Sequence, residues 1–191
     1  MVGRRVAIIV VGMPGSGKST FSAIARELGI QVINLGDMVR EEVARRGLEQ
    51  NLENLLRIAK QLREILGNDA IMKLAAPRIR EALTTHCIVV VDGVRSLDEL
   101  EYLRGIIDAE IIVLAVYAPP KLRFQRLVCR GRPGDPRTWE EFKKRDLEEL
   151  SWGLGNVVAL ADMVIVNEGS YEEFISSVKT VLSKVYTQWC I

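Results

Sequence analysis

One nine-residue segment constrains the fold and chemistry of this chain more than any other. It reads Gly12-Met13-Pro14-Gly15-Ser16-Gly17-Lys18-Ser19-Thr20 and contains the pattern GxxxxGK[ST]. The apolar run Val6–Val11 comes directly before it, and the residues from Thr20 to Leu28 have helical character. Glycines let such a loop wrap with its N–H groups pointing inward at a helix N-terminus, where they bind anions. The segment therefore predicts a phosphate-binding loop between a strand and a helix.

The loop also supplies groups that a nucleoside triphosphate requires. Lys18 can reach the β- and γ-phosphates, and the hydroxyl of Ser19 can coordinate Mg²⁺. Asp92 ends a second apolar run, Cys87–Val91, so it is a candidate for the acid beside the Mg²⁺. We therefore predict a triphosphate site with Ser19 and Asp92 at the metal. The residues expected to bind the nucleotide are Gly12, Pro14, Gly15, Ser16, Gly17, Lys18, Ser19 and Thr20.

Apolar and helical stretches alternate along the chain. Continuous apolar runs rich in β-branched residues predict strands that are covered on both faces. There are five such runs: Val6–Val11, Val32–Leu35, Cys87–Val91, Ile111–Tyr117 and Met163–Val166. Three helix starts carry a capping box, at Ser96-x-x-Glu99, Thr138-x-x-Glu141 and Ser170-x-x-Glu173. The alternation predicts an α/β fold with a mainly parallel sheet.

Two intervals are too long for simple crossovers between strands. Asp37 to Leu83 has only helical pattern, with a stop at Gly47, a break at Gly67-Asn68 and a kink expected at Pro77. Arg130 to Asn156 begins with a Gly- and Pro-rich loop and continues into a charged helix. Insertions at the carboxyl ends of parallel strands are where such sheets bind ligands. The alternative is that both intervals are extra helices that only pad the fold.

Charge and hydropathy exclude several classes of protein. The chain has 26 Lys+Arg against 25 Asp+Glu, whereas nucleic-acid-binding domains usually have a large basic excess, so no nucleic-acid partner is expected. No apolar run approaches the roughly 18 residues that span a bilayer, so we expect no membrane partner and a cytoplasmic location. The charges are balanced over the whole chain but not locally, because Pro119–Asp146 holds nine Lys/Arg and four Asp/Glu. This basic segment favours a small, highly charged ligand.

The rarer residue types predict no further chemistry. Cys87, Cys129 and Cys190 are widely separated and form no CxxC pair, and His86 is the only histidine. A structural zinc site or a Cys/His catalytic pair is therefore not expected. We interpret His86 as structural, and Trp139 and Trp152 as packing residues rather than stacking platforms for a base.

Short motifs beyond the loop resemble those of the nucleoside monophosphate kinases, adenylate kinase above all. Gly36-Asp37-Met38-Val39-Arg40 is similar to the Gly-Asp-x-x-Arg that opens their acceptor domain, and Asp92-Gly93-Val94-Arg95 is similar to their Asp-Gly-Phe-Pro-Arg. Arg126 and Arg130 resemble their two lid-hinge arginines. The tail Ala161–Ser170 is closer to dephospho-coenzyme A kinase. Over nearly its whole length the chain resembles an archaeal family related to adenylate kinase.

The resemblance implies an architecture. Residues 1–191 would form a single P-loop kinase domain of three layers, with a five-stranded parallel sheet in the order 2-3-1-4-5. A helical acceptor-binding insertion would occupy about 37–84, and a lid would occupy about 131–150.

The resemblance also implies roles for individual residues. Arg40 and Arg95 would grip the acceptor phosphate, in a pocket shaped by Gly36, Asp37 and Gly93. On the donor side, Arg126 would lie along the adenine of ATP, Arg130 would touch the phosphates, and Asn167 to Gly169 would border the base. The arginines expected to close over the transferring group are Arg132, Arg137 and Arg145. Arg is well suited to these places because its planar fork meets phosphate at two points.

Other interpretations of these residues remain open. Asp37 could serve only as a helix N-cap, Arg95 could be a surface residue before the Ser96 cap, and lid arginines could be solvated. The chain also departs from the adenylate kinase pattern. Leu35 stands where a small polar residue usually reads the acceptor base, the proline before Arg95 is missing, and no glutamine for adenine is evident downstream. The lid region lacks zinc cysteines.

The sequence as a whole predicts an ATP- and Mg²⁺-dependent kinase that transfers the γ-phosphoryl group to a nucleoside monophosphate. AMP is the first candidate for this acceptor. Two alternatives remain. One is a small-molecule kinase acting on the hydroxyl of dephospho-coenzyme A, with Asp37 as base. The other is an ATP-binding switch or assembly factor that hydrolyses ATP slowly and acts through a protein or RNA partner.

Overall fold

The sheet has the predicted topology. The computed structural model describes residues 5–132 and 134–191, so Pro133 of the expected lid and residues 1–4 lie outside it. The strands are β1 (Val6–Val11), β2 (Gln31–Asn34), β3 (Ile88–Asp92), β4 (Glu110–Tyr117) and β5 (Met163–Val166). All pair in parallel, in the order β2-β3-β1-β4-β5. The α/β fold and the strand order predicted from the sequence are confirmed.

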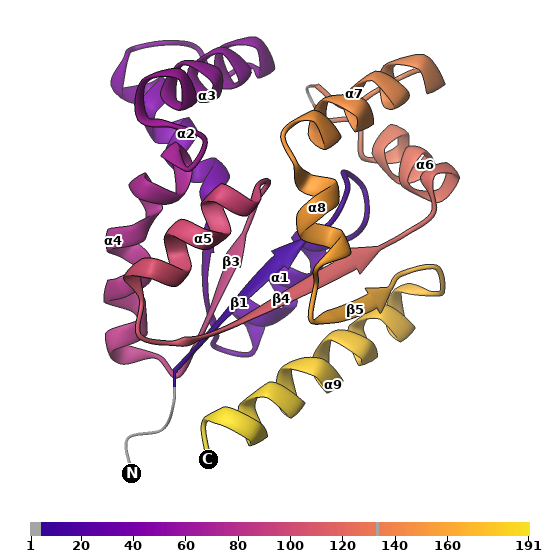
Figure 1. Ribbon diagram of the computed structural model, residues 1–191. Coiled ribbons are helices and arrows are strands. Elements are labelled where there is room, and N and C mark those ends of the chain that lie inside the picture. The colour runs from indigo at the N-terminus through magenta and orange to yellow at the C-terminus, as the bar shows by residue number, and fades with distance from the viewer. Residues whose placement is uncertain (1–4, 133) are drawn as a thin grey trace.

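Helices cover both faces of this sheet, which makes three layers (Figure 1). The helices are α1 (Lys18–Glu27), α2 (Leu35–Arg45), α3 (Leu52–Leu66), α4 (Ala70–Thr85), α5 (Leu97–Ile106), α6 (Pro120–Arg130), α7 (Trp139–Ser151), α8 (Leu154–Ala159) and α9 (Tyr171–Trp189). Alternate residues of β1 enter different cores. Ala7 and Ile9 pack with α4, α5 and α8, whereas Ile8 and Val10 pack with α1 and α9. Because both faces are buried, the strand is apolar throughout, as a covered parallel strand requires.

Two groups of helices extend beyond the sheet. Figure 1 shows α2 and α3 rising on one side of the loop after β1, and α6 and α7 rising on the other. The expected breaks are present, since α2 ends before Gly47 and α3 ends at Gly67. Pro77, where a kink was expected, lies inside α4. Among the described residues, no helix combines the length and the apolar character needed to cross a membrane.

The start of α2 differs from the sequence prediction. Leu35 was expected in the second strand, but it is the first residue of α2. The Asn34 side chain accepts a hydrogen bond from the Gly36 N–H at 2.8 Å and caps the helix, so Asp37 is not the N-cap. Asn is among the best capping residues because its short side chain reaches the unpaired N–H groups of the first turn.

The capping boxes are confirmed at Thr138 and Ser170. At α5, Ser96 does cap the helix, with its Oγ accepting from the Glu99 N–H at 3.2 Å. The Glu99 carboxylate, however, accepts from the N–H of Arg95 at 2.7 Å. The carboxylate of Glu99 therefore also binds the backbone one residue before the cap and turns toward the loop after β3.

A disulfide joins Cys87, just before β3, to Cys190, just after α9. The wide spacing and odd number of the cysteines did not predict this bond. It links residues that are 103 positions apart and fastens the last helix to the edge of the sheet where the strands begin. Cys129 is a free, exposed cysteine.

Removing this bond should destabilise the fold. A cross-link stabilises a protein mainly by restricting its unfolded state, typically by about 2–4 kcal/mol. We expect Cys87→Ser, or reduction of the wild type, to lower the free energy of unfolding by about that amount, measured by chemical denaturation with and without reductant. Cys129→Ser is the matched control and should unfold as the wild type does. Equal midpoints for oxidised and reduced wild type would contradict the expectation.

Candidate active site

The loop after β1 is held in a conformation that only glycine adopts without strain. Gly17 has φ +117°, and a Cβ added there would lie 2.3 Å from Nδ2 of Asn167. Gly12 has φ +149°, and its Cβ would lie 2.3 Å from the carbonyl oxygen of Val116. The backbone of β4 and the end of β5 therefore pack directly against the loop. A side chain at either position would push the loop away from the sheet.

Lys18 is the first residue of α1 and lies over the loop. Its Nζ donates hydrogen bonds to the carbonyl oxygens of Gly12 and Met13. Burial lowers the pKa of the Lys18 ammonium, while the carboxylates of Asp92 and Glu149 act in the opposite direction without outweighing it. A half-buried cation that has no carboxylate within ion-pair distance among the described residues favours an anionic ligand.

A cavity of about 370 Å³ opens beside the loop, and we call it the donor cavity. Most of the residues expected at the triphosphate line it. They are Pro14, Gly15, Gly17, Lys18, Ser19, Thr20, Arg126, Arg130, Arg132 and Arg145. Arg95 and Glu149 also line it, although the sequence placed Arg95 on the acceptor side alone. The cavity thus brings cations from four separate segments of the chain to one anion-binding loop.

Other predicted donor residues lie outside this cavity. Ser16 is buried beneath the loop, and its Oγ makes no hydrogen bond with any described residue. The exposed side chain of Arg137 lines neither this cavity nor the one described next. Gly169 also lies outside the lining. Asn167 is buried, and its Nδ2 donates to the Ser16 carbonyl at 2.8 Å while its Oδ1 accepts from Arg126 at 3.1 Å. In this arrangement Asn167 orients both the loop and Arg126.

The arginines of the lid segment are organised by one carboxylate that the sequence analysis missed. Asp135 accepts hydrogen bonds from both Arg130 and Arg145, and from the backbone N–H of Arg132. Burial acts to raise the pKa of Asp135, but hydrogen bonds from Arg130 and Arg132 outweigh it and hold the pKa below its usual value. Asp135 thereby holds three positively charged residues at the mouth of the donor cavity.

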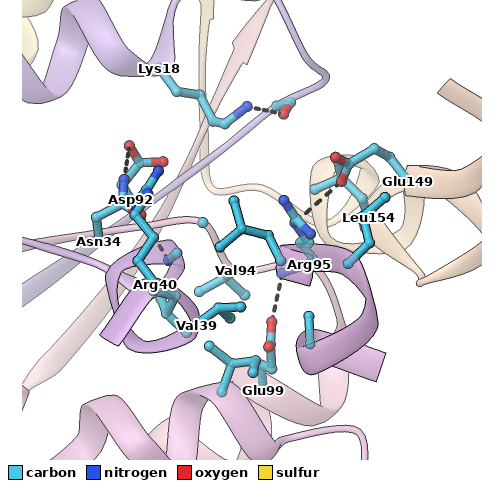
Figure 2. Close-up of a pocket in the computed structure, with 18 of the residues that line it drawn as sticks. Lys18, Asn34, Val39, Arg40, Asp92, Val94, Arg95, Glu99, Glu149 and Leu154 are labelled. Atoms are coloured by element: carbon cyan, nitrogen blue, oxygen red, sulfur yellow. Dashed lines mark hydrogen bonds and ion pairs between the residues drawn. The ribbon is translucent and has the colours of Figure 1, made fainter. Parts of the chain in front are cut away.

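A second cavity of about 300 Å³ lies between α2, α3, the loop after β3 and the end of α7, and we call it the acceptor cavity (Figure 2). Gly36, Arg40, Gly93 and Arg95 line it, as the resemblance implied. Asp37 does not. Its carboxylate is half exposed and pairs with Arg40 from outside the cavity.

The acceptor cavity also contains groups that the sequence did not indicate. Glu149 of α7 is 7% exposed and lies 3.3 Å from Nε of Arg95. The Arg95 guanidinium stacks over the ring of Trp152 at 4.8 Å, and that of Arg63 lies over the same ring at 5.5 Å. Arg63 in turn lies 3.8 Å from Glu99. These five residues link α3, α5 and α7 by charged and aromatic contacts, and all of them except Trp152 line the cavity.

The two cavities meet at the end of the phosphate loop. Five residues line both of them: Lys18, Ser19, Arg95, Arg145 and Glu149. Three of the five are cations, which matches the charge that a transferring phosphoryl group spreads over its oxygens. A ligand in one cavity would therefore meet a ligand in the other at this junction.

Asp92 and Ser19 offer a fitting donor set for Mg²⁺. Both line the acceptor cavity near its junction with the donor cavity. The Oδ2 atom of buried Asp92 accepts hydrogen bonds from Ser22 at 3.0 Å and Asn34 at 3.3 Å. Mg²⁺ is usually held by one or two carboxylates together with phosphate oxygens and water, so one acid and one hydroxyl suffice beside a triphosphate. Among the described residues no group of three or more His, Cys, Asp and Glu forms a separate metal cluster.

Arg123 of α6 supports the site through its contacts, although no sequence motif indicated it. It is 4% exposed and forms two hydrogen bonds to Asp146 of α7, at 2.8 and 2.6 Å. Nη1 also donates to the carbonyl of Pro14 in the phosphate loop at 3.1 Å. Its guanidinium lies over the ring of Phe142. One buried arginine thus joins the loop to the helix that carries Arg145 and Glu149.

Known proteins are similar to this chain in sequence. The family described as "AAA domain" matches residues 11–143. A UPF0200 protein of Hyperthermus butylicus is 52% identical over 184 residues, which cover 96% of this chain and 97% of the relative. A UPF0200 protein of Thermococcus gammatolerans is 48% identical over 179 residues, which cover 93% and 94%.

Solved structures agree on the fold. TT1252 from Thermus thermophilus has a TM-score of 0.65 at 24% identity, over 95% of this chain and 98% of that one. Shikimate kinase from Bacteroides thetaiotaomicron has a TM-score of 0.57 at 18% identity, over 94% and 98%. At these identities the likeness concerns the fold alone. Taken with the close sequence relatives, it shows that the chain belongs to the UPF0200 family and has a P-loop, kinase-like α/β fold.

Proposed function

We propose that the protein is a Mg·ATP-dependent phosphotransferase that moves the γ-phosphoryl group to a small acceptor. The observation that carries this proposal is the junction of the two cavities, where Lys18, Arg95 and Arg145 converge. Phosphoryl transfer depends mainly on positioning and on cations around the γ-phosphoryl oxygens, and the junction offers both. Residues 37–84 would form the acceptor-binding part and residues 131–150 the lid.

Each residue of the donor side has a task in this reaction. The loop N–H groups and Lys18 would bind the phosphates of ATP, and Ser19 and Asp92 would hold Mg²⁺, which supplies charge neutralisation. Arg126 would lie along the adenine, and Arg130, Arg132 and Arg145 would enclose the phosphates. A lid rich in arginine also excludes water, which limits hydrolysis of ATP.

The acceptor that the arginines favour is a nucleoside monophosphate, with AMP as the first to test. Arg40, Arg63 and Arg95 line the acceptor cavity, and each is paired with a carboxylate of the protein itself. A phosphate monoester carries enough negative charge to replace those partners. It is already a nucleophile, so this reaction needs no strong general base.

A second acceptor class is favoured by Glu149. This buried carboxylate lines both cavities, where it could take the proton of an attacking hydroxyl group. The geometry supports it in that role better than Asp37, whose carboxylate lies outside the acceptor cavity. An alcohol such as dephospho-coenzyme A would then be phosphorylated.

One assay tests the function and separates the two acceptor classes. Formation of ADP from Mg·ATP would be followed with AMP, other nucleoside monophosphates, shikimate and dephospho-coenzyme A, each with identification of the phosphorylated product. Transfer to a monophosphate supports the first class, and transfer to an alcohol alone supports the second. ATP hydrolysis without any phosphorylated product would refute the phosphotransferase proposal.

Arg40→Ala should weaken acceptor binding far more than ATP binding. Arg40 lines only the acceptor cavity, and a charge-assisted hydrogen bond to phosphate contributes about 1.5–3 kcal/mol, or roughly 10- to 100-fold in affinity. The measurement is KM for the acceptor and for ATP in the same assay. Arg45→Ala, an exposed arginine on the same helix, is the matched control. Equal losses for both substrates would contradict the assignment.

A further inference from the structure

Glu99 is the most deeply buried carboxylate lining the acceptor cavity. The residue is 1% exposed and lies in the first turn of α5. Its Oε2 accepts from the N–H of Arg95, whereas its Oε1 accepts no hydrogen bond from the described residues. Nη2 of Arg63 lies 3.8 Å from Oε1, which is an ion pair and too long for a hydrogen bond.

An unpaired acceptor in such a place is unusual. Leaving a buried acceptor without a hydrogen bond costs about 1–3 kcal/mol, and more for a charged group. Burial raises the pKa of Glu99, while the Arg95 N–H and the guanidinium of Arg63 act to lower it. Glu99 lines the acceptor cavity, so a ligand bound there can supply the donor that Oε1 lacks.

The position of Glu99 indicates which end of the acceptor it would meet. Figure 2 shows Lys18 and Glu99 on opposite sides of the cavity, with Val94 and Arg95 between them. The reacting phosphate belongs near Lys18, so Glu99 would meet the far end of the molecule. Apolar side chains also line the cavity, among them Leu35, Val39, Leu55, Ile71, Val94 and Leu154.

We propose that Glu99 selects the acceptor by accepting a hydrogen bond from an N–H group of its nucleobase. The inference rests on the proposed function, and it adds the chemical class of the acceptor: a nucleoside monophosphate whose base carries an amino group. The apolar walls would pack against the faces of the ring, and Oε1 would receive the amino hydrogen. Adenine, guanine and cytosine all offer such a group, and of these the test uses the two purines.

The test compares acceptors that differ only in this donor. Purine riboside 5′-monophosphate has the shape of AMP but lacks the amino group. For the wild type we expect kcat/KM with AMP to exceed that with the purine analogue, and kcat/KM with GMP to exceed that with IMP, which lacks the 2-amino group, by about 10- to 100-fold, the value of a hydrogen bond to a charged group. The preferred member of the pair AMP and GMP then identifies the base.

Variants of Glu99 show whether the preference comes from this side chain. Glu99→Met removes the acceptor at similar length, and the ratio between AMP and the analogue should fall toward one. Glu99→Gln keeps the shape and one acceptor oxygen, so it remains informative if the methionine variant does not fold, and its ratio should lie in between. Asp98→Asn, an exposed neighbour on the same turn, is the control and should keep the wild-type ratio.

The possible failures are distinguishable. If no nucleoside monophosphate is phosphorylated, the proposed function fails, and this inference fails with it. If monophosphates are phosphorylated but the purine analogue serves as well as AMP, and IMP as well as GMP, only the role of Glu99 is refuted. If Glu99→Met reduces turnover of AMP and of the analogue by the same factor, Glu99 only supports the loop at Arg95, and the inference is again overturned.

Discussion

Replacing Lys18 by alanine is expected to abolish phosphoryl transfer and to leave the fold intact. Lys18 lines both cavities and is the cation of the loop that can follow the γ-phosphoryl group. Losing a group that stabilises transition-state charge costs on the order of 10²- to 10³-fold or more in kcat. The measurement is the rate of ADP and product formation at saturating ATP, together with thermal unfolding.

The fold should tolerate this change because the charge of Lys18 does not stabilise it. Burial lowers the pKa of Lys18, which means that the folded state disfavours the protonated ammonium. Below the folded-state pKa this charge therefore opposes folding, and its removal should not lower the free energy of unfolding. The charge becomes favourable when a triphosphate enters. Lys184→Ala, an exposed lysine on α9, is the control for activity. A folded Lys18→Ala protein with near-wild-type turnover would rule out this site.

The fold could be predicted because its signals are local. The strand β1 ends where the phosphate loop begins, and both ends of the predicted run Val6–Val11 agree with the structure. When charged helices lie between them, continuous apolar runs have few structural alternatives to buried parallel strands. The error at Leu35 has the same origin, because an apolar residue after Asn34 continues the strand pattern, whereas Asn34 itself starts the helix.

The charged network around the site could not be predicted, because its partners are distant in sequence. Arg123 and Asp146 are 23 residues apart, and Arg63 and Glu99 come from different helices. Each of these residues alone resembles a solvated charge on a helix surface, which is the commonest role for such side chains. Glu99 was interpreted as half of a capping box, and only the structure shows that its carboxylate enters the acceptor cavity.

Arg123→Ala is expected to lower stability and transfer together. Arg123 and Asp146 form a buried, bidentate pair, and removing one partner of a buried pair leaves the other charge uncompensated, at a cost of about 3–5 kcal/mol. Lys121→Ala, an exposed cation on the same helix, should stay within about 0.5 kcal/mol of the wild type. Chemical denaturation of both variants measures the difference.

The effect on transfer follows from what Arg123 connects. Its guanidinium donates hydrogen bonds to the carbonyl of Pro14 and to the carboxylate of Asp146. Asp146 directly follows Arg145 in the chain. When this link is lost, α7 is free to shift against the loop, and a displacement of about 1 Å at a transferring group can cost roughly 10²-fold in rate. The loss should appear mainly in kcat, since Arg123 itself lines neither cavity.

Arg123→Lys distinguishes positioning from simple loss of charge. Lysine keeps the positive charge beside Asp146, but it cannot reach both carboxylate oxygens and the Pro14 carbonyl at once. We expect this variant to recover much of the stability and little of the turnover, measured at a temperature where it is fully folded. Full recovery of kcat by lysine would mean that charge alone is needed at position 123. Full recovery of neither property would mean that the bidentate geometry sustains both the fold and the alignment of α7 with the phosphate loop.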